Sequence, residues 1–200
     1  MKKALSFLIA ACLILVLSFP AFAKLERTGY REITVSEMMT IPDAVAFKKM
    51  MNENRHIKEW TIEIISGGGY TVSGITMYNI IKELQKQGVK FNTIVRGEAD
   101  SMAAILFLVG DKRIVYEGAQ VMFHKAYQAN RVTGVKITPP KGSDAEKALK
   151  LTNDFLINTL KVFYDNDIKK VDELLEKTTR YSAKELHELG IATNYINLVE

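Results

Sequence analysis

Apolar residues along the chain recur in short blocks whose spacing alternates between that of strands and that of helices. Residues 33–41, 60–65 and 89–95 are predicted strands, because they favour extended backbone and either alternate or run apolar. Helices are predicted after the first two, at 42–54 and 71–87, where apolar residues return every three or four positions. This alternation predicts an α/β fold with a largely parallel sheet in a single domain.

The second half of the chain continues this pattern and then departs from it. Residues 101–109 form a predicted buried helix, followed by short predicted strands at 113–116 and 120–123. Residues 127–143 contain two glycines and two prolines and are expected to form a surface loop. Beyond it we expect three helices and a final extended segment, at residues 144–164, 171–177, 182–189 and 191–199.

The first 23 residues differ in composition from the rest. Residues 1–3 are basic, residues 4–17 are almost wholly apolar, and Pro20 precedes an Ala-x-Ala pattern that ends at Ala23. This arrangement is typical of a secretory signal peptide. We therefore expect cleavage after Ala23 and a mature domain of residues 24–200 in the periplasm or outside the cell.

Two other interpretations of this N-terminus stay open. An uncleaved membrane anchor would need an apolar run of about 20 residues, and this run is shorter. Lipid attachment at Cys12 would require a polar chain soon after it, whereas the apolar stretch continues. Cys12 is the only cysteine, so a mature chain without residues 1–23 has no disulfide and no thiol nucleophile.

Charge and histidine placement argue against two classes of function. The chain has 27 Lys and Arg and 23 Asp and Glu, a net charge of +4. Two of the lysines lie in residues 1–23, so the mature domain would carry only +2, without a basic stripe for nucleic acid. His56, His124 and His187 are too far apart in sequence to show metal-ligand spacing. We expect no metal, no cofactor and no nucleic-acid partner.

Three features supply candidate parts for acyl transfer. Ser101 lies at a predicted strand-to-helix corner, where the helix N-terminus favours developing negative charge. His124 ends a short predicted strand downstream and is a candidate base. The run Gly67–Gly69 follows a buried strand and offers backbone N–H groups to an oxyanion. Each feature also has a purely structural explanation, as a helix cap, a strand end or a tight turn.

Four segments resemble the Clp protease proteolytic subunit family in their order and spacing. They are residues 66–74, 97–103, 121–124 and 181–190, within a resemblance that covers most of residues 30–198. The resemblance implies the ClpP fold, which is a crotonase-like spiral of ββα units, and peptides or unfolded proteins as substrates. It implies that Ser101 is the nucleophile and His124 the general base. It also implies that Gly69 and Met102 donate their backbone N–H groups to the oxyanion.

The chain departs from the family at the third member of the catalytic triad. Counting back from Ser182 places Thr178 where the family has an aspartate, and threonine carries no charge. Glu176 and Asp172 lie nearby and are candidates for the acid that orients His124. Disabling that role costs about 10⁴ in rate in a serine protease. Three cases stay open: another acid serves, the site is a slow Ser/His dyad, or the protein is not catalytic.

Two further departures concern the surroundings of the site. The family has Ser-Pro-Gly-Gly at residues 66–69, where this chain has three glycines, and it has a small residue at the position of Asp100. Only residues 24–30 precede the first predicted strand, which leaves little room for the segment that reaches an ATPase ring in the family. We therefore expect a serine peptidase without an ATPase partner. A noncatalytic scaffold is the first alternative, and a crotonase acting on acyl-CoA is the second.

The helix predicted at residues 144–164 has a larger apolar face than a lone surface helix needs. The residues of this face are Ala145, Leu149, Leu151, Phe155, Leu156 and Leu160. The resemblance implies that subunits assemble through this region. Together these two points predict a homo-oligomer, with the shape of a ring.

Overall fold

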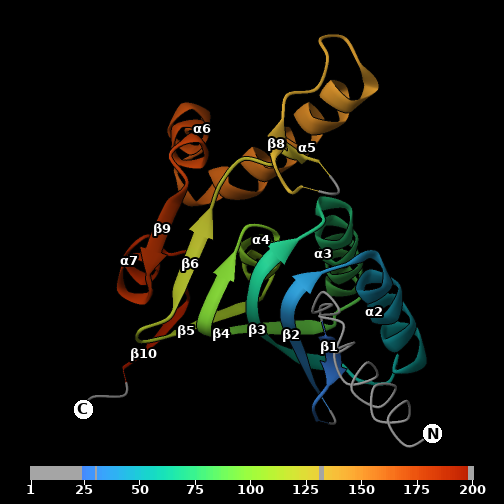
Figure 1. The fold of residues 1–200 in the computed structure, drawn as a ribbon. Coiled ribbons are helices and arrows are strands. Elements are labelled where there is room, and N and C mark those ends of the chain that lie inside the picture. Colours follow the sequence, from blue (N-terminus) through green and yellow to red (C-terminus); the bar gives the residue numbers. More distant parts are fainter. Residues whose placement is uncertain (1–23, 30, 131–132, 198–200) are drawn as a thin grey trace, which may run out of the picture.

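A computed structural model describes residues 24–29, 31–130 and 133–197 (Figure 1). The predicted signal peptide, residues 1–23, lies outside this part of the chain, so its cleavage stays a prediction. Among the described residues, no helix combines the length and the apolar composition that a bilayer crossing requires.

Strands and helices alternate through the first half of the chain. The elements are β1 (Lys24–Arg27), β2 (Glu32–Met39), α2 (Ile41–Glu53), β3 (Glu59–Gly69), α3 (Thr71–Lys86), β4 (Lys90–Asp100) and α4 (Met102–Leu108). The second half contains β5 (Lys112–Tyr116), β6 (Gln120–Phe123), β7 (Gln128–Ala129), β8 (Lys136–Ile137), α5 (Asp144–Leu160), the 3₁₀ turn η1 (Lys161–Phe163), α6 (Ile168–Glu176), β9 (Thr179–Ser182), α7 (Ala183–Glu188) and β10 (Asn194–Ile196).

The central sheet branches at β4. The main path runs β1-β2-β3-β4-β5-β10, and β6 and β9 lie off it. Strand β4 pairs with β5 through residues 92–95 and with β6 through residues 98–100, so its two halves have different neighbours. Only β1–β2 and β6–β9 are antiparallel among these pairs. The prediction of an α/β fold with a largely parallel sheet is confirmed, and the branching agrees with a spiral of ββα units.

Helices α2, α3 and α4 pack together, and α4 contacts β3 and β4. All seven residues of α4 are buried, because its short apolar sequence is enclosed on every side. Gly74 of α3 lets the two helices approach closely, since a Cβ there would lie 3.0 Å from the Cβ of Met102. The start of α4 is therefore held rigidly against α3.

Helix α5 extends away from the sheet, and the β7–β8 hairpin lies beside it (Figure 1). Its predicted apolar face is divided between two environments. Leu156 and Leu160 are buried against the body of the domain, whereas Leu151 is 70 % exposed. The segment predicted to be a loop at residues 127–143 contains the small hairpin, and the predicted helix ends at Leu160 with a turn of 3₁₀ helix after it.

Candidate functional site

Ser101 forms the corner between β4 and α4. Its backbone lies at φ 56° and ψ −121°, a region that residues other than glycine rarely adopt. The Ser101 N–H donates a hydrogen bond to the carbonyl oxygen of Met122 on β6, at 2.9 Å. This bond continues the β4–β6 ladder, in which Asp100 is opposite Met122. A strained backbone that its neighbours hold in place is a frequent property of active sites.

The β4–β6 pairing also brings His124 to Ser101. His124 follows Met122 by two residues, and both His124 and Ser101 line one small cavity. The other lining residues are Thr71, Met102, Ile105, Phe123, Ala126, Leu156 and Leu175. The cavity volume of about 10 Å³ is close to the space that one water molecule needs. Among the described residues the Ser101 hydroxyl makes no hydrogen bond, and such contacts often form only when substrate binds.

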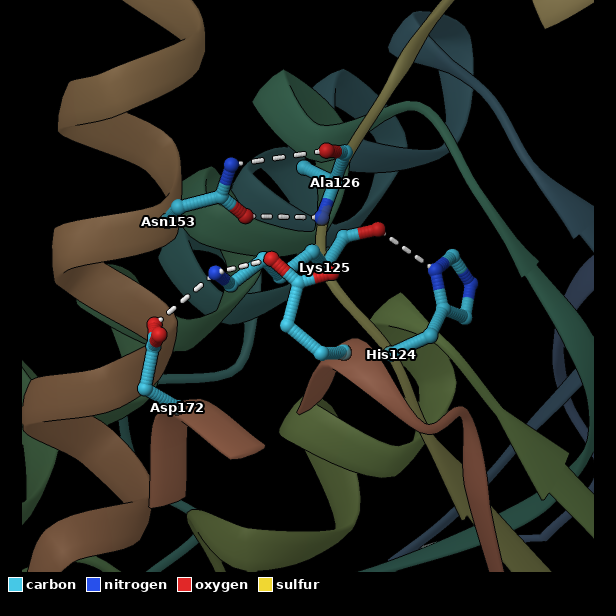
Figure 2. A network of polar contacts seen from close by, with 6 residues as sticks. His124, Lys125, Ala126, Asn153 and Asp172 are labelled. Atoms are coloured by element: carbon cyan, nitrogen blue, oxygen red, sulfur yellow. Dashed lines mark hydrogen bonds and ion pairs between the residues drawn. The ribbon is translucent and has the colours of Figure 1, made fainter. Parts of the chain in front are cut away.

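The imidazole of His124 is oriented by a backbone carbonyl. Its Nδ1 lies 2.6 Å from the carbonyl oxygen of Lys125 (Figure 2). A carbonyl can only accept, so in the neutral imidazole Nδ1 carries the hydrogen and Nε2 keeps its lone pair. The ring of Tyr127 lies beside the imidazole, with ring centroids 5.6 Å apart. The histidine therefore has the tautomer that a general base requires.

The glycines of β3 lie against the Ser101 corner. Strand β3 continues through Gly69, where the sequence predicted a turn. Gly68 has a φ of 101°, and a Cβ there would lie 2.7 Å from the Cβ of Ser101. The same Cβ would lie 3.1 Å from the backbone nitrogen of Met102. Only glycine therefore fits at position 68. The backbone of Gly68 lies close to Met102, so the two predicted donors to the oxyanion, Gly69 and Met102, are near each other.

The candidate acids lie near His124 but contact its neighbour. The ammonium of Lys125 lies 2.9 Å from a carboxylate oxygen of Asp172 and 2.6 Å from one of Glu176. Within the described ranges, no carboxylate contacts the imidazole of His124. Thr178 lines a hollow of about 310 Å³ together with His124. The structure therefore brings position 178 to the histidine and holds both acids on Lys125.

No cluster of three or more histidine, cysteine, aspartate or glutamate side chains that could hold a metal occurs in the described part of the chain. The polar groups around Ser101 are instead the imidazole, the hydroxyl of Thr71 and backbone amides. This set suits acyl transfer, in which a hydroxyl attacks and N–H groups stabilise the oxyanion.

An ion pair between a buried carboxylate and a half-exposed guanidinium adjoins the nucleophile corner. The guanidinium of Arg180 on β9 donates to both carboxylate oxygens of Asp100, at 3.2 and 2.6 Å. The side chain of Asp100 is only 9 % exposed. The sequence marked Asp100 as a departure from the family, but Arg180 was missed because its approach depends on β9, which was not predicted. The pair joins β4 to β9 across β6.

We expect Arg180→Met to lower the free energy of unfolding by about 2 kcal/mol, because it leaves the buried carboxylate of Asp100 without a partner. Urea unfolding followed by circular dichroism measures this change. The double variant Asp100→Ala, Arg180→Met removes both charges and should recover most of the lost stability. A single variant as stable as the wild type would show that the pair contributes nothing.

The family model of Clp protease matches residues 30–198, which is most of the chain. A comparison with curated proteins finds no match. The matched range includes Ser101, His124 and every strand of the branched sheet except β1.

Proposed function

Because this chain belongs to the Clp protease family, we propose that it is a serine peptidase that cleaves peptides through an acyl-enzyme on Ser101. Nε2 of His124 takes the Ser101 proton as Oγ attacks the scissile carbonyl carbon. Backbone N–H groups of Gly69 and Met102 donate to the oxyanion. The intermediate collapses as His124 protonates the leaving amine, and a water that His124 activates then releases the acid and restores Ser101.

One observation carries this proposal. The hydrogen bond from the Ser101 N–H to the Met122 carbonyl fixes the nucleophile to the strand that ends beside His124. The spacing between the candidate nucleophile and base is thus set by backbone pairing, which is more rigid than side-chain contact. Pre-organisation of this kind supplies much of the rate enhancement in acyl transfer.

The test is covalent labelling of the purified protein by a fluorophosphonate. An activated serine is expected to react, and mass spectrometry of the digested adduct should place the phosphonyl group on Ser101. A protein that stays unlabelled would favour the noncatalytic scaffold. That alternative is supported by Thr178, which stands where the family has its acid, and by the lack of a carboxylate on His124 within the described residues.

We also propose that the domain acts outside the cytoplasm and without an ATPase. The composition of residues 1–23, which is typical of a secretory signal peptide, supports this proposal. Protein recovered from the periplasm or the medium, with an N-terminus at Lys24, is the expected product. An intact N-terminus in the membrane fraction would instead favour an uncleaved anchor.

We propose that a second copy of the chain covers the exposed apolar surface of the β7–β8 hairpin and α5. Val135, between β7 and β8, is 61 % exposed, Leu151 of α5 is 70 % exposed, and Tyr127, just before β7, is also exposed. Light scattering at micromolar concentration should therefore report a homo-oligomer. Leu151→Glu is expected to lower the measured mass, whereas Lys150→Glu makes a larger charge change at an exposed position of α5 outside the apolar face and should not. A monomeric wild type would contradict the proposal.

A further inference from the structure

We propose that Lys125 is a positioning residue for His124, which links the carboxylates of α6 to the imidazole. The main-chain carbonyl of Lys125 orients the ring, and its ammonium anchors that peptide to Asp172 and Glu176. The inference rests on the proposed peptidase function, because it concerns how the base of that site is held. It gives Asp172 and Glu176 an indirect role instead of direct contact with the histidine.

The orienting group lies in a segment without regular secondary structure. Strand β6 ends at Phe123, so residues 124–126 have no ladder to hold them. The carbonyl of Lys125 nevertheless has to point at Nδ1 of His124, at 2.6 Å, to fix the tautomer. A carbonyl in a free loop would sample many directions and lose this bond for part of the time. The segment therefore needs other anchors.

Three such anchors surround the Lys125 peptide. The Lys125 N–H donates to the carbonyl of Leu175 on α6, at 3.1 Å. The side chain of Asn153 on α5 accepts from the Ala126 N–H at 2.8 Å and donates to the Ala126 carbonyl at 3.4 Å (Figure 2). The third anchor is the ammonium of Lys125 on Asp172 and Glu176. Contacts on both sides of the carbonyl thus fix its direction.

The ammonium anchor is charged and partly shielded from water. The side chain of Lys125 is 26 % exposed. Burial alone would lower its pKa, but hydrogen bonds and charge attraction from Glu176 and Asp172 outweigh this effect and raise it. Lys125 therefore stays protonated at neutral pH. The cluster of one ammonium and two carboxylates has one excess negative charge beside His124.

This arrangement explains how the site can work without an acid on the histidine. The carbonyl of Lys125 fixes the tautomer of His124, which is one of the two roles of a triad acid. Two models then differ in one respect. If the carboxylates of Asp172 and Glu176 act only through their charge, removal of the Lys125 ammonium makes the net charge of the cluster more negative and should not slow acylation. If Lys125 positions the carbonyl, its removal should slow acylation.

The test compares Lys125→Met with Lys125→Arg and with Lys184→Met, which breaks an exposed ion pair to Glu188 on α7. Fluorophosphonate inactivation kinetics separate the rate of Ser101 phosphonylation, which serves here as the measure of the acylation rate, from reversible binding. ¹⁵N NMR of the imidazole reports the tautomer. His124→Gln assigns the His124 signals among the three histidines. We expect Lys125→Met to lower the acylation rate about tenfold or more with unchanged binding, because the base is misplaced. The fraction of His124 that is protonated at Nδ1 should fall in parallel. Lys125→Arg should restore the acylation rate and the tautomer, and Lys184→Met should change neither.

An acylation rate and a tautomer that both stay at the wild-type values in Lys125→Met would overturn the inference. If the wild-type protein is not acylated at all, the peptidase proposal fails, but the tautomer alone still decides the role of Lys125. If Lys125→Met does not fold, the double variant Asp172→Asn, Glu176→Gln releases the same ammonium. Loss of Nδ1 protonation in that variant would support the inference, and a wild-type signal would refute it.

Discussion

Ser101→Ala is expected to abolish fluorophosphonate labelling and to lower peptide hydrolysis by at least about 10³-fold. The Ser101 hydroxyl is the atom that would form the acyl-enzyme, and residues 97–104 contain no other hydroxyl side chain. The residual rate would come from binding and oxyanion stabilisation alone. Ser101→Ala removes the side-chain oxygen, which makes no hydrogen bond among the described residues. The backbone bond to Met122 stays, so the fold should persist.

The matched control is Ser73→Ala. Ser73 is a buried serine of α3 whose hydroxyl has no hydrogen-bond partner in the described structure, so its loss should change neither labelling nor hydrolysis. Circular dichroism spectra of both variants should match that of the wild type. Labelling of Ser101→Ala at the wild-type rate would remove Ser101 from its proposed role and end the acyl-enzyme mechanism.

Thr178→Asp is expected to raise the acylation rate about tenfold or more, since it places a carboxylate where a triad acid would support the imidazolium. The residue lines the hollow that His124 also lines. Its backbone has a φ of 53°, a region that β-branched residues avoid and aspartate tolerates well. Aspartate should therefore fit this position with less backbone strain than the threonine now present.

Thr178→Asn separates charge from strain. Asparagine has nearly the shape of aspartate and also tolerates a positive φ, so it should stabilise the turn without a charge. We expect both variants to unfold at a similar or higher urea concentration than the wild type, and only Thr178→Asp to react faster. Equal acylation rates in the two variants would show that the missing charge does not limit this site.

The sequence predicted the strands and helices with strong apolar periodicity, and the structure contains them. The corner at Ser101 was predicted because an apolar helix at residues 101–109 comes soon after the strand predicted at 89–95. In the structure that strand continues to Asp100, and α4 begins at Met102. Strand β9 was missed. Its four residues, Thr179–Ser182, alternate between half-buried and exposed positions and include polar side chains at each end. Its pairing with β6 is a tertiary contact that local pattern does not encode.

The surroundings of His124 were predictable only in part. Sequence separation placed Glu176 and Asp172 near the missing acid, and the structure does place both beside the segment that follows His124. Which side chain each carboxylate meets depends on the path of residues 124–126, which have no periodic pattern. The backbone carbonyl that orients the imidazole has no side-chain signature at all. Every residue has a backbone carbonyl, so the residue types along the chain do not indicate which one orients His124.

The branching of the sheet at β4 determines how the site assembles. Among the described residues, strand β6 pairs with the main sheet through residues 98–100 of β4 and the Ser101 N–H alone. If this short ladder opens, the nucleophile corner loses its support and the histidine loses its fixed distance in the same event. The strands β2, β3 and the first half of β4 remain paired meanwhile. Local unfolding at this junction would thus switch the site off as a unit, while most of the domain stays folded.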